Sequence, residues 1–216
     1  MITIACVWVG DKYGVEYVTR LRNMVARHLP QDHDFICLTD RPGDLPDDIT
    51  PVIVTHIPGW WAKMALFSPQ LRGQYQTIYF DLDMVITGDL TPLVNWRGEF
   101  TVCENFTKLA GFPVKKNGDY GGCVMSFGPG WGDHIWQAFM MHPDHWMDVY
   151  WGEHQFVQTM IPPEYVDYLQ DVMPPGYFLH WRDFTPTKPE GCAVVVFAGS
   201  HRPDNCEVQW IKDEWR

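Results

Sequence analysis

The stretch from Thr77 to Leu90 reads TIYFDLDMVITGDL, an apolar run that leads into two carboxylates. Its β-branched and aromatic residues are typical of a buried strand. In an open α/β sheet, ligands bind beyond the carboxyl ends of the strands, so Asp81 and Asp83 are expected beside a ligand crevice. Side chains two positions apart in an extended chain point to the same side, so we expect both carboxylates to face one point.

Two carboxylates that face one point repel each other, and each resists ionisation unless a cation lies between them. A hard divalent ion that takes oxygen ligands, Mg²⁺ or Mn²⁺, suits such a pair and keeps coordination positions open for phosphate oxygens. Short acidic pairs also occur at strand ends as turn formers, and this second interpretation of Asp81 and Asp83 stays open.

The rest of the chain predicts an α/β sheet around this strand. An apolar run over residues 2–9, a glycine loop and a helical period from Tyr17 to Leu29, stopped by Pro30, form the start of a βαβ unit. A short helix over residues 62–67 carries Lys63. Further strands are predicted over residues 34–39, 52–57, 99–103, 120–127 and 193–197. A helix face over residues 135–140 is followed by His142–His145, which we interpret as a surface loop rather than half of a metal site.

The segments 63–67 and 79–90 together resemble the core of the nucleotide-sugar glycosyltransferases with the GT-A fold, particularly the family 8 type and its small bacterial and phage relatives. In that family a lysine-bearing helix precedes a strand that reads Tyr-Leu/Phe-Asp-x-Asp. The resemblance implies an α/β fold with a Rossmann-like mixed sheet flanked by helices, as a single domain over residues 1–216. It also implies transfer of a hexosyl or pentosyl group from a nucleotide-diphospho-sugar, UDP-linked, to an acceptor hydroxyl with retention.

The resemblance assigns donor-binding roles to three further residues. Tyr13 stands where the family stacks an aromatic ring on the base, although a tyrosine packed at a helix start is the alternative. Asp40 ends the second strand and can accept a hydrogen bond from the base, or it can form a turn before Pro42. Lys63 matches a basic residue near the diphosphate, with a solvated helix lysine as the alternative.

The segment from Trp151 to Val157 resembles a family motif, Gly-Asp-Gln-Asp, that lies beside the anomeric carbon. Aligned without gaps, Glu153 replaces the Asp and His154 replaces the Gln, while Gln155 lies one position further on. The resemblance therefore makes these three residues catalytic candidates. Acids are also common in the first turn of a helix because they complement its dipole, which gives Glu153 a purely structural alternative.

The chain from residue 196 to residue 203 resembles the family's closing motif, His-x-x-Gly-x-x-Lys-Pro. Gly199 and Arg202 fit the glycine and the cation that binds the diphosphate, whereas Val196 occupies the place of the metal-binding histidine. His201 is the nearest imidazole: it can turn back at Gly199 to bind the ion, or lie near the diphosphate, and we expect the second. Water and diphosphate oxygens can otherwise complete the shell of the ion. The segment from Tyr120 to Phe127 resembles the Asn-Ser-Gly-Val-Met strand, with Asp119, Gly121 and Gly122 at the positions that face the donor sugar.

Composition limits the partners. The chain has 216 residues, with 16 lysines and arginines against 27 acids, and a formal charge of −11. This charge argues against a broad nucleic-acid footprint or an anionic membrane surface. No transmembrane segment and no signal peptide is predicted, so we expect a cytoplasmic protein. The six scattered cysteines indicate buried free thiols.

The acceptor is open: a glycan, a protein or a modified nucleic acid. The polar segment 105–120, with Lys108, Lys115 and Lys116, is predicted to be a loop that faces it. Two other functions compete. A non-catalytic protein that binds nucleotide sugars or carbohydrates is favoured by the valine at position 196. A nucleotidyltransferase also needs paired acids, but the loop over residues 10–14 is short and acidic for that chemistry.

Overall fold

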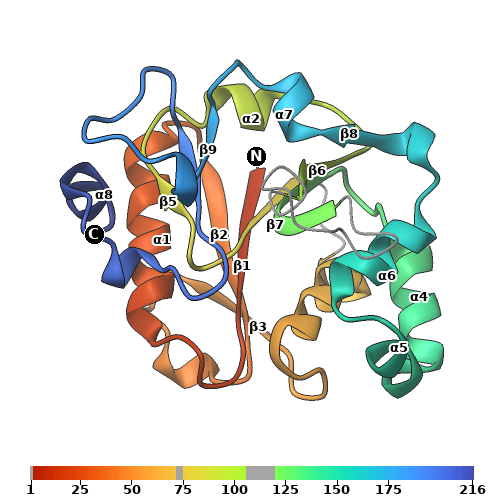
Figure 1. Ribbon diagram of the computed structural model, residues 1–216. Coiled ribbons are helices and arrows are strands. Elements are labelled where there is room, and N and C mark those ends of the chain that lie inside the picture. The colour runs from red at the N-terminus through yellow and green to blue at the C-terminus, as the bar shows by residue number, and fades with distance from the viewer. Residues whose placement is uncertain (1, 72–74, 106–119) are drawn as a thin grey trace.

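The computed structural model describes residues 2–71, 75–105 and 120–216, and they form two β-sheets with helices on both sides (Figure 1). The expected α/β class with a mixed sheet is therefore confirmed. The predicted acceptor-facing loop, including Lys108, Lys115, Lys116 and Asp119, falls mostly outside the described residues. No helix in the described ranges is long and apolar enough to cross a membrane.

The larger sheet has seven strands in the order β3-β2-β1-β4-β7-β6-β8. Neighbouring strands from β3 to β4 are parallel, and β7 runs antiparallel to both β4 and β6. Its strands are β1 (Ile2–Trp8), β2 (His33–Thr39), β3 (Thr50–Ile53), β4 (Gln76–Phe80), β6 (Phe100–Glu104), β7 (Tyr120–Phe127) and β8 (Val166–Tyr168). The third strand is shorter than predicted, because its ladder with β2 ends at Ile53.

A smaller sheet has the order β5-β10-β9 and was not predicted. Its strands are β5 (Val85–Ile86), β9 (Phe178–His180) and β10 (Val194–Val196). The apolar run after Asp83 does not continue the central strand. It leaves the larger sheet and pairs with β10, with Ile86 opposite Val194.

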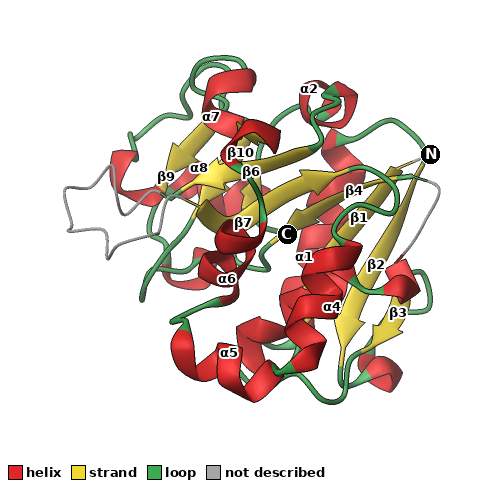
Figure 2. Cartoon of the chain, turned by 90° about the vertical axis from the view of Figure 1, so that its right-hand side faces the viewer, coloured by secondary structure: helices red, strands yellow, loops and turns green. Residues whose placement is uncertain are grey.

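Helices cover both faces of the larger sheet, as Figures 1 and 2 show. The α-helices are α1 (Val15–His28), α2 (Thr91–Asn95), α4 (Asp133–Met141), α5 (Pro143–Val149), α6 (Glu153–Met160), α7 (Leu169–Val172) and α8 (Gln209–Glu214). The 3₁₀ helices are η1 (Pro42–Asp44), η2 (Gly59–Phe67), η3 (Pro69–Leu71), η4 (Pro163–Tyr165), η5 (Trp181–Asp183) and η6 (Pro203–Asn205). The interpretation of His142–His145 as a loop is wrong: Pro143 occupies the first turn of α5, where its missing N–H costs nothing.

Two hydrophobic cores result, one on each face. Helix α1 repeats apolar residues at helical spacing, and its Val18, Leu21 and Val25 pack with α8 and the smaller sheet. On the other face, η2, α4 and α6 pack together, with the rings of Trp61 and Phe139 stacked 5.7 Å apart. All six cysteines are free thiols, and all except the half-buried Cys123 are buried, as predicted.

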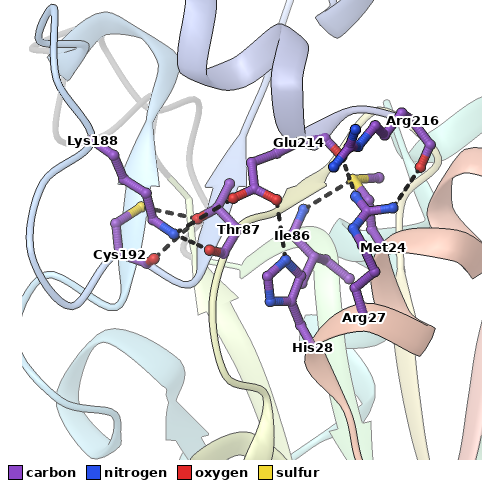
Figure 3. Close-up of polar contacts among 9 residues, drawn as sticks. All are labelled: Met24, Arg27, His28, Ile86, Thr87, Lys188, Cys192, Glu214 and Arg216. Carbon is purple, nitrogen blue, oxygen red and sulfur yellow. Dashed lines mark hydrogen bonds and ion pairs between the residues drawn. The ribbon is translucent and has the colours of Figure 1, made fainter.

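Polar contacts tie α8 and the smaller sheet to α1 (Figure 3). Arg27 donates to the backbone oxygens of Glu214 and Arg216, the latter at 2.8 Å. The Glu214 carboxylate lies 3.2 Å from His28 Nε2 and 3.8 Å from Lys188 Nζ. These contacts fix α8 against α1, while the Ile86 amide of β5 donates to the Met24 sulfur of α1 at 3.3 Å and ties the smaller sheet to the same helix.

Candidate active site

The two carboxylates of the central stretch lie just beyond β4, but a turn places them there. Strand β4 ends at Phe80, and the amide of Met84 donates to the Asp81 carbonyl over 3.2 Å. The chain is therefore folded at Leu82 and Asp83, and the expectation that extended alternation aligns the carboxylates is wrong. The turn still keeps them close. Burial and, next to it, the charge of the neighbouring Asp81 raise the pKa of Asp83 as a result.

Each carboxylate already has partners from the protein. Asp81 accepts hydrogen bonds from Lys63 Nζ at 2.8 Å and from the Tyr79 hydroxyl. Asp83, which is 7% exposed, accepts one from the Tyr13 hydroxyl at 2.8 Å and lies 3.5 Å from Arg202 Nη1. Burial and the Asp81 charge raise the pKa of Tyr79, so its hydroxyl remains a donor.

Lys63 is buried among anions, which excludes the solvated alternative. Its Nζ lies 2.8 Å from Asp81, 3.1 Å from Glu153 and 3.0 Å from the Gly122 carbonyl oxygen. Burial alone would lower its pKa, but the charges of Asp81 and Glu153 outweigh that effect and raise it. The ammonium is therefore a fixed charge that joins the end of β4 to the start of α6.

Two adjoining cavities open around this cluster, with volumes of about 440 and 270 Å³. They share Lys12, Trp60, Lys63, Asp81 and Asp83. The larger cavity is also lined by Glu153, His154, Val196, Gly199 and Arg202, and the smaller cavity is also lined by Tyr13. A cavity of about 490 Å³ lined by Lys188 and Cys192 shares no lining residue with these two and receives none of the predicted site residues.

The start of α6 confirms the predicted helix boundary at Glu153. Glu153 is 3% exposed, and burial lowers the pKa of His154, which keeps the imidazole neutral near pH 7. Gln155 does not join the cavity: its side-chain oxygen accepts from the Trp151 amide at 2.9 Å. Glu153 and His154 are therefore the two members of this predicted group that the fold brings to the cavity.

The remaining predicted residues lie at varying distances from the cluster. The ring of Tyr13 packs on Tyr17 at 4.7 Å, and Lys12 Nζ lies 4.7 Å from its centroid. Asp40 accepts from the Gly10 amide at 3.1 Å and does not line either cavity. His201 stacks on Trp181 with 3.4 Å between ring centroids, also outside both cavities.

Two contributors were missed by the sequence reasoning. Lys12 lines both cavities, and burial together with the Arg202 charge lowers its pKa. The position of Lys12 in the glycine loop, beside Tyr13, could have indicated that it lies at the site. Tyr79 bonds to Asp81 from two residues earlier, but its hydrophobic surroundings in the sequence resemble those of any core tyrosine.

The described residues hold no group of three or more His, Cys, Asp or Glu side chains suited to a metal ion. Val196 lines the larger cavity at the position of the family's histidine and offers no ligand atom. The predicted protein ligands for an ion are thus limited to the two carboxylates, Asp81 and Asp83. This donor set fits Mg²⁺ or Mn²⁺, which bind through one or two carboxylates and take further oxygens from substrate phosphates and water.

Comparisons with known proteins concern the fold of the chain. No family model and no curated protein matches the sequence. An active-site mutant of LgtC superposes with a TM-score of 0.69 at 13% identity, over 96% of this chain and 91% of that chain. The chain has the GT-A fold. The galactosyltransferase LgtC in complex with donor and acceptor sugar analogues gives a TM-score of 0.66 at 14% identity, over 98% and 93% of the two chains.

Other glycosyltransferases share this GT-A fold. GlyE of Streptococcus pneumoniae TIGR4 superposes with a TM-score of 0.65 at 16% identity, over 98% of this chain and 60% of that chain. At such identities the likeness concerns the fold alone. In this GT-A fold the cavity lies beyond the carboxyl ends of β1 and β4, which is where the general rule for open α/β sheets locates a ligand.

Proposed function

We propose that this protein is a glycosyltransferase that moves a sugar from a nucleotide-diphospho-sugar, UDP-linked, to an acceptor hydroxyl. One observation carries the proposal: paired carboxylates, three lysine or arginine cations and the acidic start of a helix converge on one cavity in a GT-A fold. The residues are Lys12, Lys63, Asp81, Asp83, Glu153 and Arg202. An anionic donor needs cations at its diphosphate, and these are present despite the acidic chain.

Asp81 and Asp83 would hold the divalent ion, Mn²⁺ or Mg²⁺. When bound, such an ion neutralises the charge that develops on the leaving diphosphate. Each carboxylate keeps a second oxygen, Asp81 Oδ2 and Asp83 Oδ1, for which no hydrogen bond or ion pair with a described residue is found. The pair can therefore face an ion without giving up the contacts that orient it.

Arg202 and Lys12, which both line the larger cavity, would receive the diphosphate. The Arg202 guanidinium already lies 3.5 Å from Asp83, and its side chain is 18% exposed. Gly199, with φ at +71°, reverses the chain between β10 and Arg202, and a glycine adopts this conformation without strain. Lys63 supports the site indirectly, because its ammonium is fully used in holding Asp81 and Glu153.

Tyr13 and Asp40 would contact the base from the loop after β1 and the end of β2. The smaller cavity contains Tyr13 together with Trp8 and Trp60, which offer aromatic surface for a base. Retention at the anomeric carbon remains the expectation from the family resemblance.

Ligand-dependent stabilisation tests this function. A nucleotide sugar that binds only the folded protein raises its melting temperature, by an amount set by concentration and affinity. We expect UDP and at least one UDP-sugar to raise it in the presence of Mn²⁺, and that sugar to be released from its donor on incubation. No stabilisation by any nucleotide sugar, with or without Mn²⁺, would refute the proposal.

A non-catalytic nucleotide-sugar binding protein is the second candidate, favoured by Val196 in place of a third metal ligand. Both candidates predict stabilisation by UDP-sugars. Only the enzyme releases free sugar and UDP from the donor at a rate that depends on Glu153 and His154. Donor hydrolysis by the purified protein therefore separates them.

A further inference from the structure

All 11 tryptophans of the chain lie in the described ranges, and two of them are largely exposed. Trp60 is 55% exposed and Trp151 is 76% exposed. Both line the larger cavity of the candidate site, Trp60 from the start of η2 and Trp151 from the segment just before α6. A large apolar side chain that stays in water at the edge of a cavity indicates a surface that a ligand covers.

Tryptophans in neighbouring segments are used for packing instead. Trp61 is 6% exposed, and its ring stacks on Phe139. Trp131, in the turn before α4, stacks on Phe100 with 4.6 Å between the ring centroids. The fold can therefore cover an aromatic ring close to its loops, and it leaves Trp151 uncovered at the cavity.

The backbone that carries Trp151 is held in place. The Trp151 N–H donates to the side-chain oxygen of Gln155 at 2.9 Å. One residue earlier, the ring of Tyr150 packs on Phe156 at 5.8 Å, and the Tyr150 amide donates to the Trp146 carbonyl at 3.0 Å. A tryptophan on an anchored backbone has few torsions left to fix when a ligand covers its ring, so Trp151 is well suited to binding.

The residues around Trp151 limit the chemistry of that ligand. The lining residues that follow it are Gly152, Glu153 and His154, so this wall has no lysine or arginine for the phosphates of a nucleic acid. The chain as a whole carries a charge of −11. The cavity's Lys12 and Arg202 are already assigned to the diphosphate of the donor.

An uncharged sugar ring matches such a wall. One face of a pyranose consists of C–H groups, which can cover the flat apolar surface of an indole, and its hydroxyls remain at the edge of the ring. The larger cavity supplies polar side chains for those hydroxyls, because Asn105 and His154 are among its lining residues. Apolar surface with a few polar groups beside it is the usual composition of a site for a small ligand.

We propose that Trp151 is the platform on which the acceptor stacks, and that the acceptor is a glycan with uncharged pyranose rings. This inference rests on the proposed function and adds its second substrate. Trp60 lines both cavities and can contact either substrate, whereas Trp151 lines only the larger of the two. Gln155, a catalytic candidate from the sequence, is instead a positioning residue that holds the backbone of Trp151.

Saturation-transfer NMR tests the platform without knowledge of the donor sugar. The full chain with UDP and Mg²⁺ is mixed with each of the neutral disaccharides lactose, maltose, cellobiose and chitobiose. We expect at least one disaccharide to bind and to receive saturation mainly at the C–H groups of one ring face. Binding of none of them by a protein that binds UDP would overturn the inference. Failure to bind UDP at all would instead refute the proposed function.

Variants of Trp151 separate stacking from general damage. Trp151→Ala should raise the Kd of the bound disaccharide about 10-fold or more and leave the Kd of UDP within about twofold, because truncation removes an aromatic anchor. Trp151→Phe keeps a ring and should stay within about threefold of the wild type. Met141→Ala is the matched control: Met141 is 72% exposed and lines neither cavity, so the disaccharide Kd should not change.

Two results with Trp151→Ala would overturn the assignment. One is a disaccharide Kd within about twofold of the wild-type value, since a platform cannot be removed at so small a cost. The other is tight binding of a single-stranded oligothymidine by the wild type that is lost in Trp151→Ala, which would make the platform a site for nucleobases.

The positioning role of Gln155 has its own readout. Gln155→Ala removes the acceptor of the Trp151 N–H and should raise the disaccharide Kd, by a smaller factor than Trp151→Ala. Gln155→Glu keeps an oxygen at the same place and should restore binding. An unchanged disaccharide Kd in Gln155→Ala would overturn the positioning role, because a residue that acts only in the chemical step leaves acceptor binding as it is.

Discussion

Replacement of Lys63 by methionine removes the ammonium that joins β4 to α6 and leaves a side chain of similar length. In the wild type Lys63 Nζ makes ion pairs of 2.8 and 3.1 Å with Asp81 and Glu153 and a 3.0 Å hydrogen bond to Gly122 O. The Lys63 and Glu153 side chains are only 11% and 5% exposed. Lys63→Met therefore leaves a buried carboxylate without its counter-ion.

The magnitude follows from how well each acid is solvated. Removal of one partner of a buried ion pair typically costs about 3–5 kcal/mol. Asp81 is 26% exposed and keeps its bond from Tyr79, so most of the penalty falls on Glu153. We therefore expect the lower part of that range, about 3 kcal/mol, in the free energy of unfolding at pH 7. The double variant with Glu153→Gln should be less destabilised than Lys63→Met alone, because it has no buried charge at position 153.

The pH dependence has a definite sign. The folded pKa of Lys63 is raised above its ordinary value of 10.5, so its stabilising effect is fully present below pH 10.5 and is lost only as the pH rises through the folded pKa. Between pH 5 and 8 the wild-type contribution is thus constant.

Urea unfolding followed by circular dichroism measures these differences at constant m-value. Lys212→Met is the matched control: Lys212 pairs with Glu207 at 3.4 Å, but their side chains are 44% and 94% exposed. Such a surface pair is worth little, and we expect a change below about 0.5 kcal/mol. A loss below about 1 kcal/mol in Lys63→Met, or no recovery in the double variant, would refute the account of Lys63 as a buried counter-ion.

Three further predictions test the site and the fold. Asp83→Asn should abolish Mn²⁺-dependent donor hydrolysis without lowering the melting temperature, because Asp83 is a buried acid beside Asp81; unchanged Mn²⁺-dependent hydrolysis would contradict its role as a ligand. Tyr13→Ala should weaken UDP binding in calorimetry by roughly 1–3 kcal/mol if the ring stacks on the base, and no loss would make Tyr13 a packing residue only. Gly132→Ala should destabilise by about 1–3 kcal/mol in urea, because its φ is +89° and the new Cβ would lie 2.5 Å from Phe67 Cδ1, whereas Gly43→Ala, with open space around its Cβ, should be close to neutral. Equal stability of these two glycine variants would contradict the steric argument.

Local patterns predicted most of the larger sheet and α1. The helical period from Tyr17 to Leu29 and the apolar runs that became β1, β2, β4 and β7 are one-dimensional signals, and they reflect burial on a fixed face. The smaller sheet has no such signal, because its pairing of Val85 with Val195 depends on how a distant segment folds back. The turn at Asp83 was missed for a related reason: a β-type sequence continues through it.

The site was predicted in its position better than in its contacts. Asp81 and Asp83 lie beyond the central strand as expected, and Glu153 begins its helix. The burial of Lys63 could not be read from the sequence, since its two partners come from separate elements. The same limit applies to Gln155, whose side chain turns back to the Trp151 amide instead of facing the cavity.

Because the cavity wall depends on the smaller sheet, we expect completion of the cavity to be a late event in folding. The Thr87 hydroxyl bonds to the Cys192 carbonyl across 105 residues of chain at 3.0 Å, and the wall that bears Arg202 follows only after β10. Closing so long a loop costs chain entropy that local helices do not, so the larger sheet can form first. Opening of the β5–β10 pairing alone would then detach Arg202 from Asp83 while the larger sheet stays folded. We therefore expect a donor that bridges Arg202 and Asp83 to slow amide hydrogen exchange in β10 at donor concentrations that leave exchange in β1 unchanged.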